Sequence, residues 1–315
     1  MLKNKKIGIT LTLTIVLAIL FRTFLPVKKS NAEIRNEFWI KKTHQTSKNA
    51  LVVGGNSRIY RGVSVKAINS VLEDELRGVN LGYSALGYSK GYLAFLESRL
   101  DLEAEHKIVL IGVDPGPLTK IAAQNKSFNS YRNINFSEVF KTLYINPYVT
   151  ISTYTPTEIR NLFNTPRGHD GFIEDRKNYF AKYHEDGWVA SYKIPNNPEE
   201  ALPIYKKFAD ENGLSIDADL VEDLLMKIEE LVGKKAIVIA FRPPSTKAMQ
   251  EWENQRYHFD ENDFKSKIEA VGGYWLEVDP EDYQSYDGAH LHYLSAEKLS
   301  KALGEKINKI LTERK

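Results

Sequence analysis

Cysteine is absent from this chain of 315 residues. Disulfide bonds, cysteine-ligated metal sites and cysteine nucleophiles are therefore excluded. The chain also lacks an excess of charge of one sign, because 43 basic and 41 acidic residues leave a formal net charge of +2. This balance gives no strong attraction to nucleic acid, and we expect no nucleic-acid partner. Apolar residues make up 42% of the chain, which is enough for a sizeable hydrophobic core.

Cofactor motifs are also missing. The sequence contains no Gly-x-Gly-x-x-Gly or phosphate-loop pattern, so nucleotide binding is not indicated. Histidines and acids occur together at His169-Asp170 and at His184-Glu185-Asp186, but without the spacing that is typical of a zinc site. We therefore expect no metal and no other cofactor.

The N-terminus carries a basic and then an apolar segment. Lysines near Met1 precede a mostly apolar stretch, Ile7–Val27, which is interrupted by Arg22. A helix that spans a bilayer needs about 20 mostly apolar residues. We expect residues 1–27 to form a single-pass transmembrane anchor that places the following domain on the extracytoplasmic side. A cleaved signal peptide is the alternative, but no Ala-x-Ala-like site follows the apolar core, and Lys28 and Lys29 come next.

Alternating strand and helix patterns follow the apolar segment. Residues 28–48 are polar and predict a stalk, or a helix leading into a domain that covers residues 49–315. The alternation in that domain is typical of an α/β fold with a doubly wound parallel sheet. The expected strands are Ala50–Val53, Gly78–Leu81, Lys107–Val113, Lys235–Phe241 and Tyr274–Val278. The expected helices are Val65–Leu76, Gly91–Leu100, Ala218–Val232, Asp263–Val271 and Ala296–Leu311, the last with Ser295 as its N-cap.

One long segment does not fit a minimal sheet. Residues 121–201 separate the third and fourth expected strands and are rich in tyrosine, phenylalanine and asparagine. An insertion after a strand end can lie over the functional edge of the sheet, as a lid or a substrate platform. The alternative is a pair of helices that only thickens the fold.

Three residues with the chemistry of a nucleophilic site lie near the ends of expected strands. Ser57 follows the first strand behind two glycines, and Asp287 and His290 precede the last helix. A serine becomes a nucleophile when a base takes its proton, and the base needs an orienting carboxylate. Because parallel strands end at one edge of the sheet, we expect Ser57 as nucleophile, His290 as base and Asp287 as its partner. His292 competes with His290 as a capping or substrate-binding residue.

Three further residues are candidates for oxyanion or substrate binding. The backbone N–H of Gly82, with that of Ser57, could donate hydrogen bonds to an oxyanion. Asp114 could do so if it is protonated; otherwise it would bind a sugar hydroxyl or cap the turn at Pro115. Arg242 could bind a carboxylate, a phosphate or an acyl carbonyl, or form an ion pair that anchors the adjacent Pro-Pro turn.

The order of these motifs resembles that of the GDSL/SGNH hydrolase family. Gly55-Asn56-Ser57 and Asp287-Gly288-Ala289-His290 match the family's serine block and its Asp-x-x-His block. Asn80-Leu81-Gly82 matches the glycine block after the second strand. Gly112-Val113-Asp114-Pro115 matches the third block in part, because Asp114 stands where the family has an oxyanion-binding asparagine. The resemblance implies a three-layer, flavodoxin-like fold and a Ser-His-Asp site.

The N-terminal segment and the insertion narrow the resemblance to a subgroup. Together with Val238–Pro244 and Asp287–Leu291, they are similar to membrane-anchored proteins that modify cell-surface polymers. These include partners of exopolysaccharide O-acetyltransferases and the D-alanyl-lipoteichoic-acid transfer protein. The resemblance implies serine-dependent transfer of an O-acetyl or similar group between an acyl donor and a cell-surface polysaccharide or polymer, with a membrane acyl-transfer protein as a candidate partner. A carbohydrate esterase and a non-catalytic scaffold for polymer assembly are the alternatives.

Overall fold

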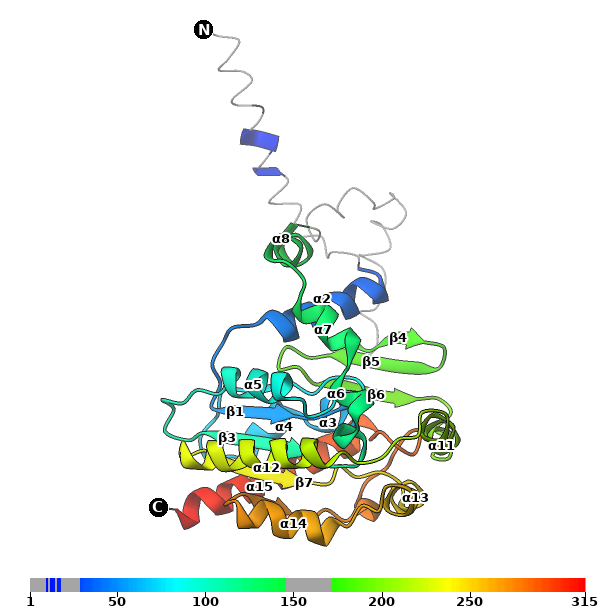
Figure 1. The fold of residues 1–315 in the computed structure, drawn as a ribbon. Coiled ribbons are helices and arrows are strands. Elements are labelled where there is room, and N and C mark those ends of the chain that lie inside the picture. Colours follow the sequence, from blue (N-terminus) through cyan, green and yellow to red (C-terminus); the bar gives the residue numbers. More distant parts are fainter. Residues whose placement is uncertain (1–9, 11, 15, 18–28, 146–170, 315) are drawn as a thin grey trace. The chain divides into compact units, whose positions relative to one another are not determined.

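The computed structural model describes residues 10, 12–14, 16–17, 29–145 and 171–314 (Figure 1). The chain divides into two compact units, one made of residues 1–41 and 134–171 and the other of residues 42–133 and 172–315. The expected anchor, residues 1–27, lies almost entirely outside the described part. Within the described part, no helix has both the length and the apolar character that a membrane span requires.

The first unit is helical where it is described. It contains most of α2 (Asn31–His44), together with α8 (Phe136–Phe140) and η2 (Lys141–Ile145). The segment expected as a stalk or a leading helix therefore contains a helix. Its last residues belong to the second unit, where the Lys42 ammonium donates a hydrogen bond to the Gly187 carbonyl at 2.8 Å. The packed domain thus begins before residue 49.

A parallel sheet forms the centre of the second unit and confirms an α/β fold. Its strand order is β2-β1-β3-β7-β8, and neighbouring strands run parallel. In this doubly wound order the connections reverse direction between β1 and β3, and ligands of such sheets bind beyond the strand ends there. Each strand lies within two residues of its expected bounds: β1 (Leu51–Gly54), β2 (Gly78–Asn80), β3 (Ile108–Gly112), β7 (Ile237–Phe241) and β8 (Tyr274–Leu276).

Helices cover both faces of this sheet (Figure 1). One face packs against α3, α4 and α15, and the other against α5 and α12, with α14 beside β8. The bounds are α3 (Ser57–Gly62), α4 (Val65–Asn69), α5 (Lys90–Arg99), α12 (Ala218–Gly233), α14 (Glu261–Ala270) and α15 (Tyr293–Glu313).

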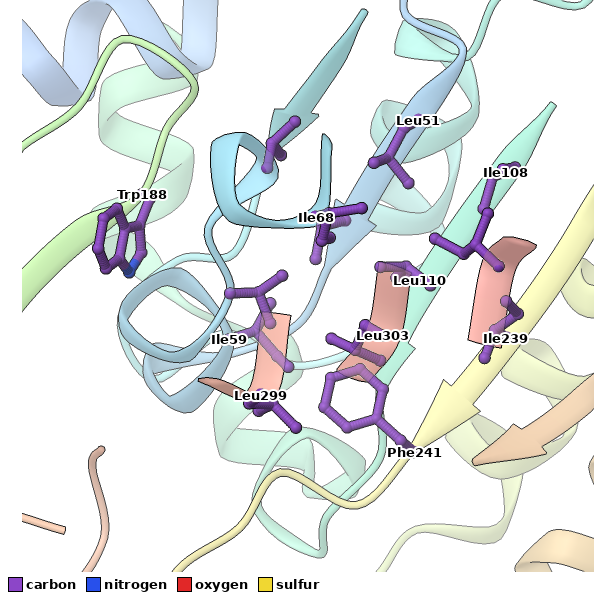
Figure 2. Close-up of a cluster of buried hydrophobic side chains, with 14 of the residues drawn as sticks. Leu51, Ile59, Ile68, Ile108, Leu110, Trp188, Ile239, Phe241, Leu299 and Leu303 are labelled. Carbon is purple, nitrogen blue, oxygen red and sulfur yellow. The ribbon is translucent and has the colours of Figure 1, made fainter. Parts of the chain in front are cut away.

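The main core lies between the sheet and α15. Alternate residues of β1, β3 and β7 point toward this helix, because side chains along a strand alternate between faces. Figure 2 shows Leu303 of α15 beside Leu110 and Phe241 from the strands, and the same cluster contains Leu51 and Leu299. All five are at most 1% exposed, and burying such a side chain stabilises the fold by about 1.5–3 kcal/mol.

Two sequence-based expectations about helices are wrong. The helix expected to run to Leu76 ends at Asn69, whose side chain accepts a hydrogen bond from the Leu76 N–H and donates one to its carbonyl. These bonds hold residues 70–76 as a loop. Ser295 is not the N-cap of α15, because the helix begins at Tyr293 with His292 as its cap. The Ser295 hydroxyl instead accepts a hydrogen bond from the Gln284 N–H at 2.8 Å.

The expected insertion contains a small antiparallel sheet that was not predicted. Its strands are β4 (Ile173–Arg176), β5 (Tyr179–Tyr183) and β6 (Val189–Lys193), and β6 packs against α3 and α15. Asn178, with a φ of 63°, turns the chain between β4 and β5.

The remaining elements of this unit are η1 (Gly116–Leu118), α6 (Lys120–Ala123), α7 (Lys126–Arg132), α11 (Ala201–Glu211), α13 (Lys247–Tyr257) and η5 (Pro280–Asp282).

Candidate active site

A sharp turn after β1 positions Ser57. Gly55 has a φ of +148°, and a Cβ atom there would lie 2.4 Å from Ile59 Cγ1, so the turn requires glycine. The Asn56 side chain then accepts a hydrogen bond from the Arg58 N–H at 2.9 Å and caps α3. Ser57 therefore becomes the first residue of a helix at the carboxyl edge of the sheet.

A second turn positions Asp287 and His290. One carboxylate oxygen of Asp287 accepts hydrogen bonds from the N–H groups of Ala289, at 2.9 Å, and His290, at 2.8 Å. Gly288 has a φ of +98°, and a Cβ atom there would lie 2.2 Å from the Pro198 carbonyl oxygen. The turn leaves the second carboxylate oxygen directed at the imidazole of His290.

The structure brings together the three residues that were expected to form a triad. Ser57 Oγ lies 2.9 Å from His290 Nε2, although the two residues are 233 positions apart. His290 Nδ1 lies 2.8 Å from Asp287 Oδ2. In this arrangement, Nδ1–H donates to the carboxylate and Nε2 is left to accept the serine proton. Such a relay can convert a hydroxyl into a nucleophile.

Burial and charge set the protonation of this relay. Burial lowers the pKa of His290 below its ordinary value, against the opposing effect of Asp287, and nearby Arg61 and Arg58 lower it further. Burial alone would raise the pKa of Asp287, but the charge and hydrogen bonds of His290 hold it well below its ordinary value. At neutral pH the site therefore contains a carboxylate and an uncharged imidazole, as a general base requires.

A cavity of about 370 Å³ lies beside Ser57 and His290. Its size falls within the range of pockets for small molecules. Most of its lining is apolar, from residues that include Leu86, Ile121, Ile204, Phe208, Leu214 and Trp252. Ile121 and the neighbouring Ala122 belong to the expected insertion, so this segment does contribute to the lining. An apolar cavity next to a serine suits the hydrocarbon part of an acyl group.

Asp114 lines the same cavity, and its contacts are those of a turn cap. One of its oxygens accepts a hydrogen bond from the Gly116 N–H at 3.0 Å, and the other accepts one from Asn56 Nδ2 at 3.0 Å. Burial raises the pKa of this carboxyl group, while the charge of Arg58 opposes the shift. Of the roles considered for Asp114, capping of the turn before Pro115 is the one that these contacts show.

The two backbone groups expected to bind an oxyanion differ in their surroundings. The Gly82 N–H donates a hydrogen bond to the Asn80 side chain at 2.9 Å, and Gly82 does not line the cavity. Its predicted role as an oxyanion donor is therefore not supported, because the group is already used inside the loop. The Ser57 N–H forms no hydrogen bond with another described residue and is available to a ligand.

Arg242 and His292 do not make the expected contacts with a substrate site. The buried Arg242 guanidinium donates hydrogen bonds to Asn254, at 2.9 Å, and to Glu253, at 3.0 Å, so it joins the end of β7 to α13. His292 accepts a hydrogen bond from the Leu294 N–H at 3.3 Å and caps α15. Neither residue lines the cavity. For each residue the structure shows the alternative to a substrate contact: an ion pair for Arg242 and a helix cap for His292.

Two residues near the site were missed in the sequence. Glu253 lines the cavity and forms a buried ion pair, at 2.6 Å, with Arg58, the residue that follows Ser57. Arg61 lines the cavity together with Ser57 and His290. The spacing of four residues between Ser57 and Arg61 would have placed them on one helical face, but a helix starting at Ser57 was not expected.

The described residues contain no group of three or more histidine, cysteine, aspartate and glutamate side chains that could hold a metal ion. His169 and Asp170 lie outside these residues, so the pair cannot be placed.

Comparisons with known proteins give little further information. No protein-family model matches the chain, and the search of curated proteins found no match. Among solved structures, one similar chain is provisionally named as a platelet activating factor from Streptococcus pneumonia. It is 10% identical with a TM-score of 0.32, and the alignment covers 93% of this chain and 98% of that one. A likeness at this level carries no conclusion about activity.

Proposed function

We propose that this protein transfers an acyl group, O-acetyl or similar, to or from a cell-surface polysaccharide or polymer, with Ser57 as nucleophile. The observation that supports the proposal is the relay from Ser57 through His290 to Asp287, with hydrogen-bonding distances of 2.9 and 2.8 Å. The order of the motifs, which resembles that of SGNH hydrolases, agrees with this chemistry. The apolar cavity beside the serine provides space for the acyl group.

In the first half-reaction, Ser57 Oγ attacks the carbonyl carbon of the acyl donor while its proton moves to His290 Nε2. The Ser57 N–H donates a hydrogen bond to the oxyanion that forms. The bond between the carbonyl carbon and the leaving oxygen then breaks, and His290 returns its proton to that oxygen. Asp287 stabilises the imidazolium that exists between these steps.

In the second half-reaction, a hydroxyl group of the acceptor attacks the acyl-serine. His290 takes the proton of this hydroxyl, the bond from the acyl carbon to Ser57 Oγ breaks, and Ser57 regains a proton. If water replaces the acceptor, the same steps release a free acid and the protein acts as an esterase. Exclusion of water from the site therefore decides between the two outcomes.

The partners and location belong to the same proposal. The N-terminal segment would anchor the chain in a membrane, with the catalytic domain on the extracytoplasmic side beside its polymer. A membrane acyl-transfer protein would then supply the activated acyl group. These assignments depend on the sequence of residues 1–27 and on the resemblance to anchored cell-envelope proteins.

Replacement of the nucleophile tests the proposal. Ser57→Ala should reduce turnover of a small acetyl ester by several orders of magnitude, because the remaining groups give only residual catalysis. Ser84→Ala is a matched control, since Ser84 also lines the cavity but forms a hydrogen bond with Tyr60. The control should keep its activity, and thermal unfolding should show that both variants are folded.

The amount of acylated polymer in cells that carry Ser57→Ala shows the direction of transfer. Less acylated polymer than in wild-type cells supports the transferase, and more supports the esterase. Unchanged acylation, together with no ester turnover by the purified wild-type protein, would overturn both and favour a non-catalytic scaffold.

A further inference from the structure

Arg61 lies in the same cavity as the candidate nucleophile. It follows Ser57 by four residues on α3, so that both side chains lie on one side of this short helix. Both residues line the apolar cavity, and His290 lines it with them. A guanidinium group is therefore close to the place where an ester bond would react.

Arg61 makes no direct contact with an acidic side chain among the described residues, although the charge of Asp287 acts on it from a distance. No aspartate or glutamate of the described residues forms an ion pair with it, and its buried Nε–H has no hydrogen-bond acceptor. Two other arginines near the site differ, because Arg58 and Arg242 both bind Glu253, at 2.6 and 3.0 Å. A buried N–H group without an acceptor costs free energy, which an anionic ligand bound at Arg61 would recover.

Aromatic rings hold the Arg61 side chain in place. Its guanidinium lies 5.0 Å from the centre of the Tyr60 ring and 5.4 Å from that of Tyr179. Burial disfavours its charged form, but Tyr179, Tyr286 and other neighbours hold the pKa of Arg61 above its ordinary value. The group is thus charged and oriented before a ligand arrives, which lowers the entropic cost of binding.

The remaining charges around the cavity do not neutralise Arg61. Glu253 is bound between two arginines, and Asp114 accepts hydrogen bonds from Asn56 and Gly116. The charge of Asp287 acts on Arg61 from a distance, but its oxygens are bonded to the His290 ring and to two backbone N–H groups. Among the described residues that line the cavity, Arg61 is therefore the cation that is left for a ligand.

We propose that Arg61 binds an anionic group, a phosphate or a carboxylate, on the alcohol part of the ester that Ser57 attacks. This inference rests on the proposed acyl transfer. The apolar part of the lining suits the acyl chain, so the polar part, which includes Arg61, is left for the alcohol from which the acyl group comes or to which it goes. A planar guanidinium can bind the two oxygens of either anion with parallel hydrogen bonds.

Matched esters test this inference in the full-length protein. Butyryl esters of glycerol, glycerol phosphate and glycerate share one acyl group and differ in the charge of the alcohol. We expect wild-type protein to hydrolyse one or both anionic esters with a higher kcat/KM than the neutral ester. The better anionic ester identifies the anion as phosphate or carboxylate.

Two substitutions and a control assign the preference to Arg61. Arg61→Met should lower kcat/KM for the preferred anionic ester about 10- to 100-fold, mainly through KM, and leave the neutral ester nearly unchanged. Arg61→Lys keeps the charge but loses the planar fork and should be intermediate. Arg256→Met is the control, because Arg256 also lies over a tyrosine ring but pairs with Asp210 and does not line the cavity.

If Arg61→Met lowers kcat/KM equally for all three esters, or lowers it for none of them, the inference is overturned. Calorimetry with glycerol phosphate and with glycerate separates it from the proposed function. Binding of an anion by wild-type protein and not by Arg61→Met would support the anion site even if no ester were turned over. Turnover of the neutral ester without binding of either anion would leave the acyl transfer standing and refute the role of Arg61.

Discussion

The reactivity of Ser57 depends on a histidine that the fold keeps uncharged. His290 is 7% exposed, and its ring stacks on Tyr286 with a centroid distance of 5.9 Å. Burial disfavours the imidazolium more strongly than Asp287 favours it, so the pKa of His290 is lowered. A base with a lowered pKa remains able to accept a proton in mildly acidic solution.

The pH dependence of ester turnover follows from this shift. His290 is active only when neutral, so kcat/KM should rise with pH through the pKa of His290 and then stay constant. Because this pKa is lowered from 6.5, the midpoint of the rise should lie below pH 6.5. Asp287→Asn removes the charge that raises the pKa, so the midpoint should fall further, with a loss of about 10⁴ in kcat. A midpoint above pH 6.5 in wild-type protein would contradict the assignment of His290 as the base.

At this scale the sequence predicted the relay but not its surroundings. The triad could be found because Ser57 directly follows an expected strand. Asp287 and His290 stand three residues apart before the last helix, a spacing that lets the carboxylate reach the imidazole. For Arg242 the sequence left a substrate contact and an ion pair open, because its partner, Glu253, is on a helix that gave no sequence signal. Arg61 was missed because short helices such as α3 are set by a cap and a turn, and not by apolar periodicity.

At the scale of elements, α15 carries much of the core and packs closely on α4. A Cβ atom at Gly304 would lie 2.7 Å from the Ile68 carbonyl oxygen and 2.5 Å from Val71 Cγ2. The Ser300 hydroxyl accepts a hydrogen bond from the Ser64 N–H at 2.8 Å, just ahead of α4. The contact between these helices therefore requires a small residue at position 304.

Gly304→Val should lower the free energy of unfolding by about 1–3 kcal/mol, since added atoms in a packed contact force the backbone apart. Denaturant titration followed by circular dichroism measures the change. Gly233→Ala, near the end of α12, is the control, because a Cβ atom there meets nothing within 4 Å. This control should be neutral or slightly stabilising. Equal stability of Gly304→Val and wild-type protein would show that α15 can move away from α4.

Among the elements, the buried strands were the most predictable and the short ones the least. The three central strands β1, β3 and β7 are continuous apolar runs, which strands covered on both faces require. The antiparallel strands β4 to β6 were missed, since their faces mix charged and aromatic residues. An alternating pattern around Asn178 was the available signal for β4 and β5.

At the scale of the whole molecule, the fold gathers distant segments at one edge of a sheet. Ser57 follows β1 and Asp114 follows β3, on either side of the point where the strand order reverses. The alternation of strands and helices alone does not fix the strand order, because that order depends on which apolar faces pack against each other. The division of the chain into units was not anticipated either, since residues 134–171 group with the N-terminal residues.

The proposed anchor is testable on the intact chain. Full-length protein should fractionate with membranes, because the apolar stretch Ile7–Val27 is long enough to span a bilayer. A chain shortened to begin at Ala32 should remain in the supernatant after centrifugation. Protease added to cells with an exposed membrane surface should degrade the domain if it is extracytoplasmic. Recovery of the full-length protein in the supernatant would refute the anchor, and full protection from protease would reverse its orientation.

The central claim is that the fold makes Ser57 a nucleophile. The most direct measurement is the reaction of intact protein with a fluorophosphonate, followed by mass spectrometry of the peptides. The account predicts one adduct, on Ser57, which is absent from Ser57→Ala and forms much more slowly in His290→Ala. Folded wild-type protein that stays unmodified, or that carries its adduct on another serine, would contradict the account.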